Sequence, residues 1–189
     1  MDMPAAVILA GGLATRMGGG DKGLRPWRRA TLLDAVIARI APQVGALALN
    51  ANGDAARFAR FGLPVLPDPV PGHPGPLAGV LAALEWTQAR GRTRVLTVPC
   101  DTPDLPADLV RHLRAADAGR GAVAADASGR LHPTVALWPV ALAPALADYL
   151  STGGRRVGRF AAQAGLAVAR FPAAAADPFA NVNSPDDLQ

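Results

Sequence analysis

The sequence has one cysteine, one lysine and few aromatic residues. The shortages of cysteine and of aromatic residues each argue against a class of protein. Cys100 has no partner for an internal disulfide, which favours a reducing compartment and a buried structural thiol. Aromatic residues are 5% of the 189, too few for base-stacking platforms, and the basic residues are scattered along the chain. Nucleic-acid binding is therefore not predicted, and phosphate-bearing small molecules are the anionic partners that a net charge of +4 favours.

Long hydrophobic runs are also lacking. No stretch reaches the roughly 18 to 20 apolar residues of a membrane span, and the first five residues are acidic rather than basic, so neither membrane insertion nor a signal peptide is predicted. We expect a cytoplasmic protein. Half of the residues are hydrophobic, enough for one sizeable core, whereas a division into two domains would leave each near the lower limit of domain size. Residues 1–189 are therefore predicted to form a single domain, which we expect to be a monomer.

Short apolar runs alternate with helical patterns along the chain. Strands are predicted at 5–10, 44–50, 63–66, 94–99, 122–125, 134–138 and 166–171, and helices at 31–42, 54–61, 77–90, 106–116, 140–149 and 155–164. Thr31 is the candidate N-cap of the first helix. Several strands are continuously apolar, as in strands buried on both faces. The pattern predicts an α/β fold of Rossmann-like type, with three layers and a mostly parallel central sheet.

A glycine-rich loop, LAGGLATRMGGGDKG, follows the first strand. Its glycines allow backbone N–H groups to approach phosphate oxygens, and Arg16 and Lys22 add positive charge. Lys22 is the only lysine among 19 basic residues, and a compact ammonium differs from a guanidinium as a phosphate ligand. The loop is not a Walker A motif, its GxGxxG match at Gly18 begins too far past the strand, and a purely structural turn remains an alternative.

Other polar residues follow the later strands, where ligands bind in open α/β sheets. Asp101 in VLTVPCDTPDLP is placed to hold Mg²⁺, or alternatively to cap the next helix. Asn50, Asn52 and Asp68 have the groups to bind a base or ribose, or to satisfy turns. His73 and the GPLAG segment open a helix, where they could offer amides to an anion or simply start the helix. His132, which precedes a proline, could equally be a satisfied loop histidine.

Taken together, these segments resemble the molybdenum cofactor guanylyltransferases. The resemblance rests on LAGG with RMGGGDKGL, NAN, LPDP, GPLAG, PCDTPDLP, HPT, GGRRV and NVNSPDDL, which occur in order across nearly the whole chain. It implies a Rossmann-like nucleotidyltransferase that transfers GMP from GTP to molybdopterin carrying molybdenum, with Mg²⁺, by attack of a molybdopterin phosphate oxygen on the α-phosphorus of GTP. Transient contacts with molybdopterin-delivering and molybdoenzyme-maturation proteins are expected as well.

The resemblance also implies roles for individual residues. It implies that Asp101 holds the metal, and because phosphoryl transfer needs charge neutralisation we expect Arg16, Lys22 and Asp101 to be the catalytic residues. The implied GTP contacts are Leu9, Ala10, Gly11, Gly12, Lys22, Asn50, Asp68 and Asp101. The side that receives the pterin is expected to contain Gly75, Gly79, Arg155, Arg156, Asn181 and Asn183.

The departures from the family pattern are small. Residues 27–31 replace a turn that usually contains glycine, and Ser184 stands where threonine is common. Related cytidylyltransferases typically have LAAG, so Gly11 and Gly12 favour guanine. A cytidylyl- or sugar-nucleotide transferase and a non-catalytic nucleotide-binding protein remain alternatives. A dinucleotide-dependent oxidoreductase is less favoured because Asn50, not an acidic residue, ends the second strand.

Overall fold

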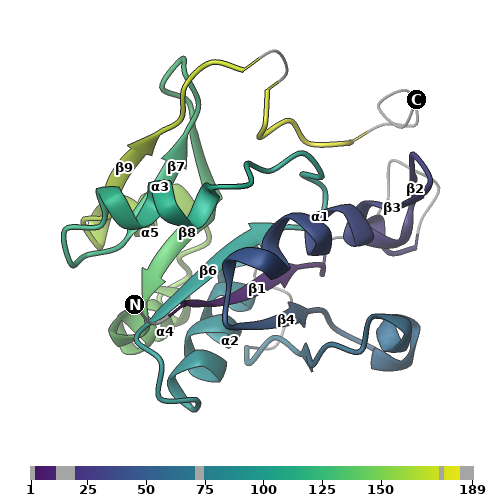
Figure 1. Cartoon of the computed structure of the whole chain (residues 1–189). Helices are drawn as coiled ribbons and strands as arrows, with labels where there is room; N and C mark the ends of the chain where they lie inside the picture. Colours follow the sequence, from purple (N-terminus) through teal and green to yellow (C-terminus); the bar gives the residue numbers. More distant parts are fainter. Residues whose placement is uncertain (1–2, 12–19, 71–74, 175–176, 184–189) are drawn as a thin grey trace.

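A computed structural model of the chain describes residues 3–11, 20–70, 75–174 and 177–183. Its centre is a seven-stranded sheet with the order β5-β4-β1-β6-β8-β7-β9 (Figure 1). The strands are β1 (Ala5–Leu9), β4 (Ala46–Asn50), β5 (Val65–Leu66), β6 (Arg94–Pro99), β7 (Ala122–Ala125), β8 (Leu131–Pro139) and β9 (Ala167–Arg170). Only β8 runs antiparallel to its neighbours in this sheet. The predicted α/β class with a mostly parallel sheet is confirmed.

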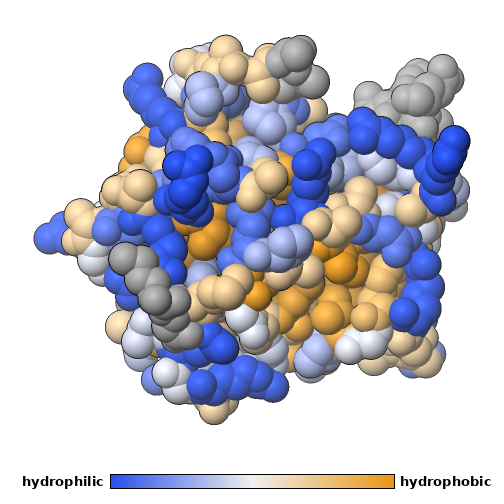
Figure 2. All heavy atoms as spheres, viewed as in Figure 1, coloured by the Kyte–Doolittle hydropathy of each residue, from blue (hydrophilic) through white to orange (hydrophobic). Residues whose placement is uncertain are grey.

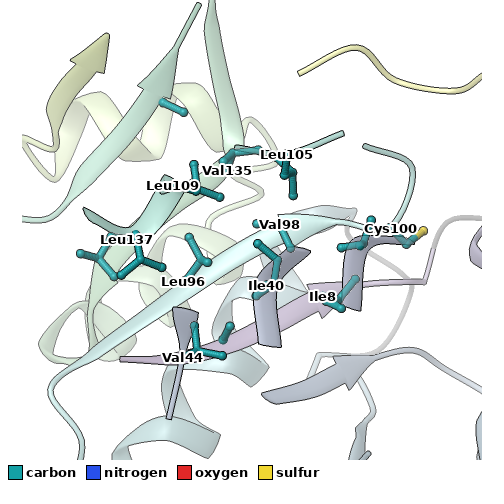
Figure 3. Packing of buried hydrophobic residues seen from close by; sticks show 14 of the residues in the cluster. Ile8, Ile40, Val44, Leu96, Val98, Cys100, Leu105, Leu109, Val135 and Leu137 are labelled. Atoms are coloured by element: carbon teal, nitrogen blue, oxygen red, sulfur yellow. The ribbon is translucent and has the colours of Figure 1, made fainter. Parts of the chain in front are cut away.

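Helices cover both faces of the sheet. On one face α1 (Leu32–Ile40) and α3 (Leu109–Ala116) share a cluster with alternate residues of β1 and β6, among them Ile8 and Val98 (Figure 3), and α3 itself lies against β7, β8 and β9. On the other face α2 (Pro76–Gln88), α4 (Ala143–Ser151) and α5 (Val157–Gln163) pack on the remaining strand residues, among them Val7 and Trp138. The continuous burial of β1 follows from this three-layer arrangement.

Local sequence explains where α1 begins. The Thr31 hydroxyl accepts a hydrogen bond from the backbone N–H of Asp34, and the Asp34 carboxylate accepts one from the backbone N–H of Thr31. This reciprocal capping box satisfies two of the N–H groups that a helix start leaves unpaired. The predicted N-cap is therefore confirmed.

Several boundaries differ from the predictions. The helix expected from residue 106 begins at Leu109, and the strand expected at 134–138 is longer, Leu131–Pro139. The segment 54–61 forms a 3-10 helix, η4 (Ala55–Phe61), with the Asp54 carboxylate as its cap. A further 3-10 turn, η5 (Val140–Leu142), precedes α4, and η3 (Ala41–Gln43) follows α1.

A hairpin that the sequence did not predict lies between the glycine-rich loop and α1. It consists of β2 (Pro26–Trp27) and β3 (Ala30–Thr31), and it follows the short 3-10 helix η2 (Lys22–Leu24). Arg28 at its tip has a positive φ of 53°, a conformation that glycine adopts at lower cost. The hairpin thus retains the shape of a glycine turn although no glycine is present there.

The surface combines charged margins with a hydrophobic area. In the view of Figure 2, hydrophobic atoms are exposed below α1, on the side of the molecule that contains β4. Leu47, Phe61, Leu63 and Val65 are partly buried residues packed against the cluster under α1. No helix in the described part of the chain has the length and apolar character that a membrane span requires.

Candidate active site

The candidate site lies where the strand order reverses. β1 pairs in parallel with β4 on one side and with β6 on the other, and Leu9 is in register with both Asn50 and Pro99. The N–H of Ala10 donates to the carbonyl of Asn50 at 2.8 Å. The carboxyl ends of the three strands therefore meet at one edge, which is the position where open α/β sheets bind ligands.

Lys22 and Asp101 form an ion pair at this edge. The Lys22 ammonium lies 2.6 Å from Asp101 Oδ2, and both side chains are about one-seventh exposed, 14% and 13%. Gly23 allows this approach, because a Cβ there would lie 3.3 Å from the Cβ of Cys100 and 3.5 Å from that of Leu33. The lone ammonium and the strand-terminal carboxylate thus lie together at this edge, while their convergence through a divalent ion on one polyphosphate stays a prediction.

The second oxygen of Asp101 suits a metal ion. Oδ1 is buried and has no hydrogen-bond partner among the described residues, which is costly for a carboxylate oxygen unless a ligand completes the site. The described residues contain no group of three or more His, Cys, Asp or Glu side chains that could hold a metal. A single carboxylate fits Mg²⁺, which is usually held by one or two carboxylates together with substrate phosphates.

The alternative interpretation, in which Asp101 caps the next helix, is wrong, because Asp101 is not the cap of α3. The helix begins at Leu109 with Asp108 in the N-cap position, and Asp104 accepts two hydrogen bonds of 3.3 Å from Arg28 of the β2–β3 hairpin. Among these acidic residues, Asp101 is the one paired with Lys22.

Cys100, which precedes Asp101, is a structural residue. It is 3% exposed and packs in the cluster under α1 (Figure 3). Burial, followed by the negative charge of Asp101, raises the pKa of its thiol to about 12. The thiolate that nucleophilic chemistry would need is therefore not formed near neutral pH.

A second polar group lies at the ends of β4 and β5. The side-chain amide of Asn50 donates to Asp68 Oδ1 at 2.9 Å and to the carbonyl of Leu66 at 3.1 Å. The amide of Asn52 donates to Asp68 Oδ2 at 2.7 Å and its oxygen accepts from the N–H of Asp68 at 2.8 Å. We call Asn50, Asn52 and Asp68 the amide–carboxylate cluster. The structure brings these three residues together.

Glycine is needed at two positions of α2, at its N-cap and inside the helix, for different structural reasons. Gly79 packs on the amide–carboxylate cluster, because a Cβ there would lie 2.2 Å from Asn50 Oδ1 and 2.9 Å from Leu9 Cδ2. Gly75 is the N-cap of α2 with a φ of 83°, which favours glycine, and Pro76 follows at the first helical position. Gly79 is thus required for the close approach of α2 to the strand ends.

The described segment 177–183 returns to the site. The N–H of Val182 donates to the carbonyl of Asp101 at 2.9 Å, and the Thr102 hydroxyl donates to Asn181 Oδ1 at 2.9 Å. Lys22 also donates to Asn183 Oδ1. The residues predicted on the acceptor side, Asn181 and Asn183, therefore lie directly beside the Lys22–Asp101 pair.

Phe179 anchors this returning segment. Its buried ring stacks on His132 with centroids 4.6 Å apart and meets the edge of Phe171 at 5.1 Å. His132 in turn lies 3.3 Å from Asp126 through Nε2. The structure supports the interpretation of His132 as a satisfied structural histidine.

Arg155 and Arg156 belong to the turn between α4 and α5. Arg155 donates to the carbonyls of Leu150 at 3.0 Å and Gly154 at 2.7 Å, and Arg156 is the N-cap residue of α5. A Cβ at Gly158 would lie 3.3 Å from the ring of Pro133, which follows His132. The turn is therefore close to the start of β8, while the guanidinium of Arg155 contacts its own loop.

Some predicted residues lie outside the described part of the chain. Gly12 and Arg16 of the glycine-rich loop are among them, as are His73 and Ser184. Leu9, Ala10 and Gly11 are described, with Leu9 and Ala10 buried at the end of β1.

Sequence reasoning missed two residues of the site. Arg57 Nε donates to Asp21 Oδ2 at 2.6 Å, which ties η4 to the residue before Lys22. Asp21 belongs to the segment GGGDKG of the glycine-rich loop, but Arg57 follows 36 positions later, so no local pattern indicated that the two side chains form an ion pair.

Comparison with known proteins agrees with this geometry. Residues 6–166 match the profile of the MobA-like NTP transferase domain. A protein of Rhodopseudomonas palustris strain BisB5 named molybdenum cofactor guanylyltransferase is 51% identical and is aligned over 99% of this chain and 92% of its own. A protein of Acidiphilium cryptum with the same name is 50% identical over 97% and 91% of the two chains.

Solved structures share the fold at lower identity. Molybdopterin-guanine dinucleotide biosynthesis protein A of Archaeoglobus fulgidus superposes with a TM-score of 0.73 at 21% identity, covering 97% of this chain and 94% of its own. Rv0371c of Mycobacterium tuberculosis in complex with manganese superposes with a TM-score of 0.68 at 21% identity, covering 98% and 95%. These two likenesses bear on the fold alone.

Proposed function

This chain belongs to the MobA-like NTP transferase family, and from that membership we propose that it transfers GMP from GTP to molybdenum-carrying molybdopterin and releases pyrophosphate. It is a nucleotidyltransferase that forms the guanine dinucleotide form of the molybdenum cofactor. The observation that supports the chemistry most directly is the ion pair of Lys22 and Asp101 at the reversal point of the sheet, with one Asp101 oxygen unpaired among the described residues.

The reaction is an in-line displacement at the α-phosphorus of GTP. A terminal phosphate oxygen of molybdopterin forms the new bond, the bond from the α-phosphorus to the bridging oxygen breaks, and pyrophosphate leaves with that oxygen. No covalent intermediate with the enzyme is needed, so the protein contributes positioning and charge neutralisation. Lys22 provides a mobile positive charge, and it must exchange its contacts with Asp101 and Asn183 for phosphate oxygens when substrate binds.

Asp101 is the proposed metal ligand. It would hold Mg²⁺, the proposed ion, which would supply positive charge to neutralise the phosphate oxygens. Its main chain, two residues past the end of β6, is held by Val182, whose N–H donates to the Asp101 carbonyl, and its side chain is held by Lys22. Arg16 is proposed as a further phosphate ligand of the glycine-rich loop.

The remaining residues divide between the two substrates. We propose that Leu9, Ala10, Gly11 and Gly12 contact GTP through the main chain at the end of β1, and that Asn50 and Asp68 bind its base or ribose. Gly75, Gly79, Arg155, Arg156, Asn181 and Asn183 are proposed for the side that receives the pterin. We further propose that the chain works as a single domain and as a monomer.

Replacement of Asp101 by asparagine tests the assignment. Asp101→Asn keeps the shape of the side chain but removes its charge, and we expect GMP transfer to fall by about 100-fold or more, the usual cost of losing one electrostatic contact at a reacting centre. Asp104→Asn is the matched control, because Asp104 lies three residues away and pairs with the exposed Arg28. Pyrophosphate release is measured with GTP, CTP and UTP in the presence of molybdenum-carrying molybdopterin.

The outcome is read together with thermal unfolding, so that loss of activity is separated from loss of fold. Full turnover by Asp101→Asn would remove the metal assignment. A preference for CTP or UTP over GTP in the wild type would instead favour a cytidylyl- or sugar-nucleotide transferase.

A further inference from the structure

Arg57 bridges two parts of the site that are separate in the sequence. Its Nε donates to Asp21 Oδ2 at 2.6 Å, and Asp21 directly precedes Lys22. Its Nη2 donates to the carbonyl of Asn52, a member of the amide–carboxylate cluster. One guanidinium therefore contacts both the residue next to the proposed phosphate-binding ammonium and the loop whose Asn52 is hydrogen-bonded to the proposed base ligand Asp68.

The surroundings of Arg57 keep the guanidinium in one orientation. Its Nη1 donates to the carbonyl of Asp54, so the loop 52–54 wraps around it with two carbonyl groups. Gly53 makes this loop possible with a φ of 80°, and a Cβ there would lie 3.3 Å from Nη1. The ring of Phe58 lies 4.7 Å from the guanidinium carbon. The planar guanidinium has a fixed set of donor directions, and this loop matches them.

The bridge is half-buried, which makes it stronger than an ordinary surface ion pair. The side chains of Arg57 and Asp21 are 27% and 16% exposed. Arg60 on the same 3-10 helix makes a comparable pair with Asp34, at 2.7 Å with 52% and 32% exposure, but on the side of the capping box of α1. The chain thus offers an ion pair of similar chemistry on the same element that does not join the two parts of the site.

A continuous series of contacts connects the two ends. Asn52 and Asp68 are joined by two hydrogen bonds, so they move as one unit. The carbonyl of Asn52 binds Arg57, Arg57 binds Asp21, and Asp21 is bonded to Lys22 through the main chain. A ligand that shifts the Asn52–Asp68 unit therefore changes the position of the Lys22 segment through this one guanidinium.

We propose that Arg57 is a positioning residue that couples recognition of the base to the placement of Lys22 against the triphosphate. The proposal rests on the proposed function, because it takes the amide–carboxylate cluster as the base site and Lys22 as the phosphate ligand. Binding at either end makes binding at the other end more favourable, and by linkage the two effects are equal in size. If the bridge only stabilised the fold, its loss would weaken the binding of both ligands equally and would leave the coupling between them unchanged.

The two halves of the nucleotide provide the test. Guanosine and magnesium pyrophosphate are titrated by calorimetry, each alone and each in the presence of the other, with wild type, Arg57→Gln, Arg57→Lys and the control Arg60→Gln. In the wild type we expect each ligand to tighten the other by about 5- to 10-fold, the lower range of measured coupling between sites. Arg57→Gln loses this factor, Arg57→Lys recovers part of it, and Arg60→Gln keeps it.

A second variant protects the test against misfolding. Asp21→Ala removes the other end of the bridge and leaves the contacts of Arg57 with loop 52–54 in place; the Asp21 side chain makes no capping bond to η2. We expect it to lose the coupling as well, while a cooperative thermal unfolding transition shows that the variant is folded.

Retained coupling in Arg57→Gln and Asp21→Ala, or no coupling in the wild type, overturns the proposal. The proposed function fails in a different way, by absence of GMP transfer in a wild type that binds both ligands.

Discussion

Substitution of Gly79 by alanine tests how closely α2 must approach the strand ends. The new Cβ would lie 2.2 Å from Asn50 Oδ1, 2.8 Å from Asn50 Cγ and 2.9 Å from Leu9 Cδ2. Neither neighbour can yield easily: Asn50 is 5% exposed and bonded to Leu66 and Asp68, while Leu9 is packed in the cluster under α2. The overlap must therefore displace the Asn50 amide or the helix.

The magnitude follows from two opposing effects. Overpacking costs about 1 to 3 kcal/mol, and contact with two fixed side chains places this site in the upper part of that range. Alanine returns about 1 kcal/mol relative to glycine inside a helix. The net loss of about 1 to 2 kcal/mol should lower the unfolding midpoint by about 3 to 6 °C in a chain of this size. Loss of one Asn50 hydrogen bond should weaken GTP binding about fivefold.

Differential scanning calorimetry and GTP titration with Mg²⁺ measure both effects. Gly158→Ala in α5 is the control, because its Cβ would meet only the ring of Pro133, at 3.3 Å. It should leave GTP affinity unchanged. If Gly79→Ala has the wild-type midpoint and the wild-type affinity, the spacing between α2 and β4 is adjustable and the packing argument is wrong.

Three further predictions concern the ionisable side chains of Lys22, Cys100 and Asp117. Lys22→Arg keeps the charge at the site but changes its geometry, and kcat should fall by about 100-fold, the effect of a misplacement of about 1 Å; unchanged kcat in the transfer assay would refute the need for an ammonium. Because the pKa of Cys100 is raised to about 12, iodoacetamide at pH 8 should label the native protein negligibly and the urea-unfolded protein fully, as seen by mass spectrometry. Burial alone would raise the pKa of Asp117, but hydrogen bonds from Arg94 and two backbone N–H groups outweigh it and the pKa is lowered. The stability it contributes is present above its unfolded pKa of about 3.9 and is lost as pH falls through the lower folded value, so the midpoint difference between wild type and Asp117→Asn should shrink below about pH 4. A difference that does not shrink as the pH falls below about 4 would contradict this assignment.

Residues at strand ends were the most informative part of the sequence. Lys22, Asn50, Asp68 and Asp101 were predicted to share one edge of the sheet, and the contacts of Lys22 with Asp101 and of Asn50 with Asp68 agree with this. The prediction worked because parallel strands end at a common edge, so the order of strands and loops along the chain already limits where their last residues lie. The roles of these residues in binding GTP stay predictions.

The site contains contacts that no local pattern indicated. Asn183 was predicted on the acceptor side through the resemblance, but its contact with Lys22 joins residues 161 positions apart. The β2–β3 hairpin was missed because its turn has no glycine, and Arg28 adopts the positive φ instead.

The sequence by itself determined the alternation of helices and buried strands, the cap at Thr31 and the identity of the residues at the strand ends, because periodicity and capping depend on neighbours within a few positions. Tertiary structure alone decided the strand order, the antiparallel direction of β8, the return of residues 177–183 to Asp101 and the bridge from Arg57 to Asp21. These features depend on which apolar faces pack together and in which register. Residues close in the chain carry no information about that choice, which is made by the packed core as a whole.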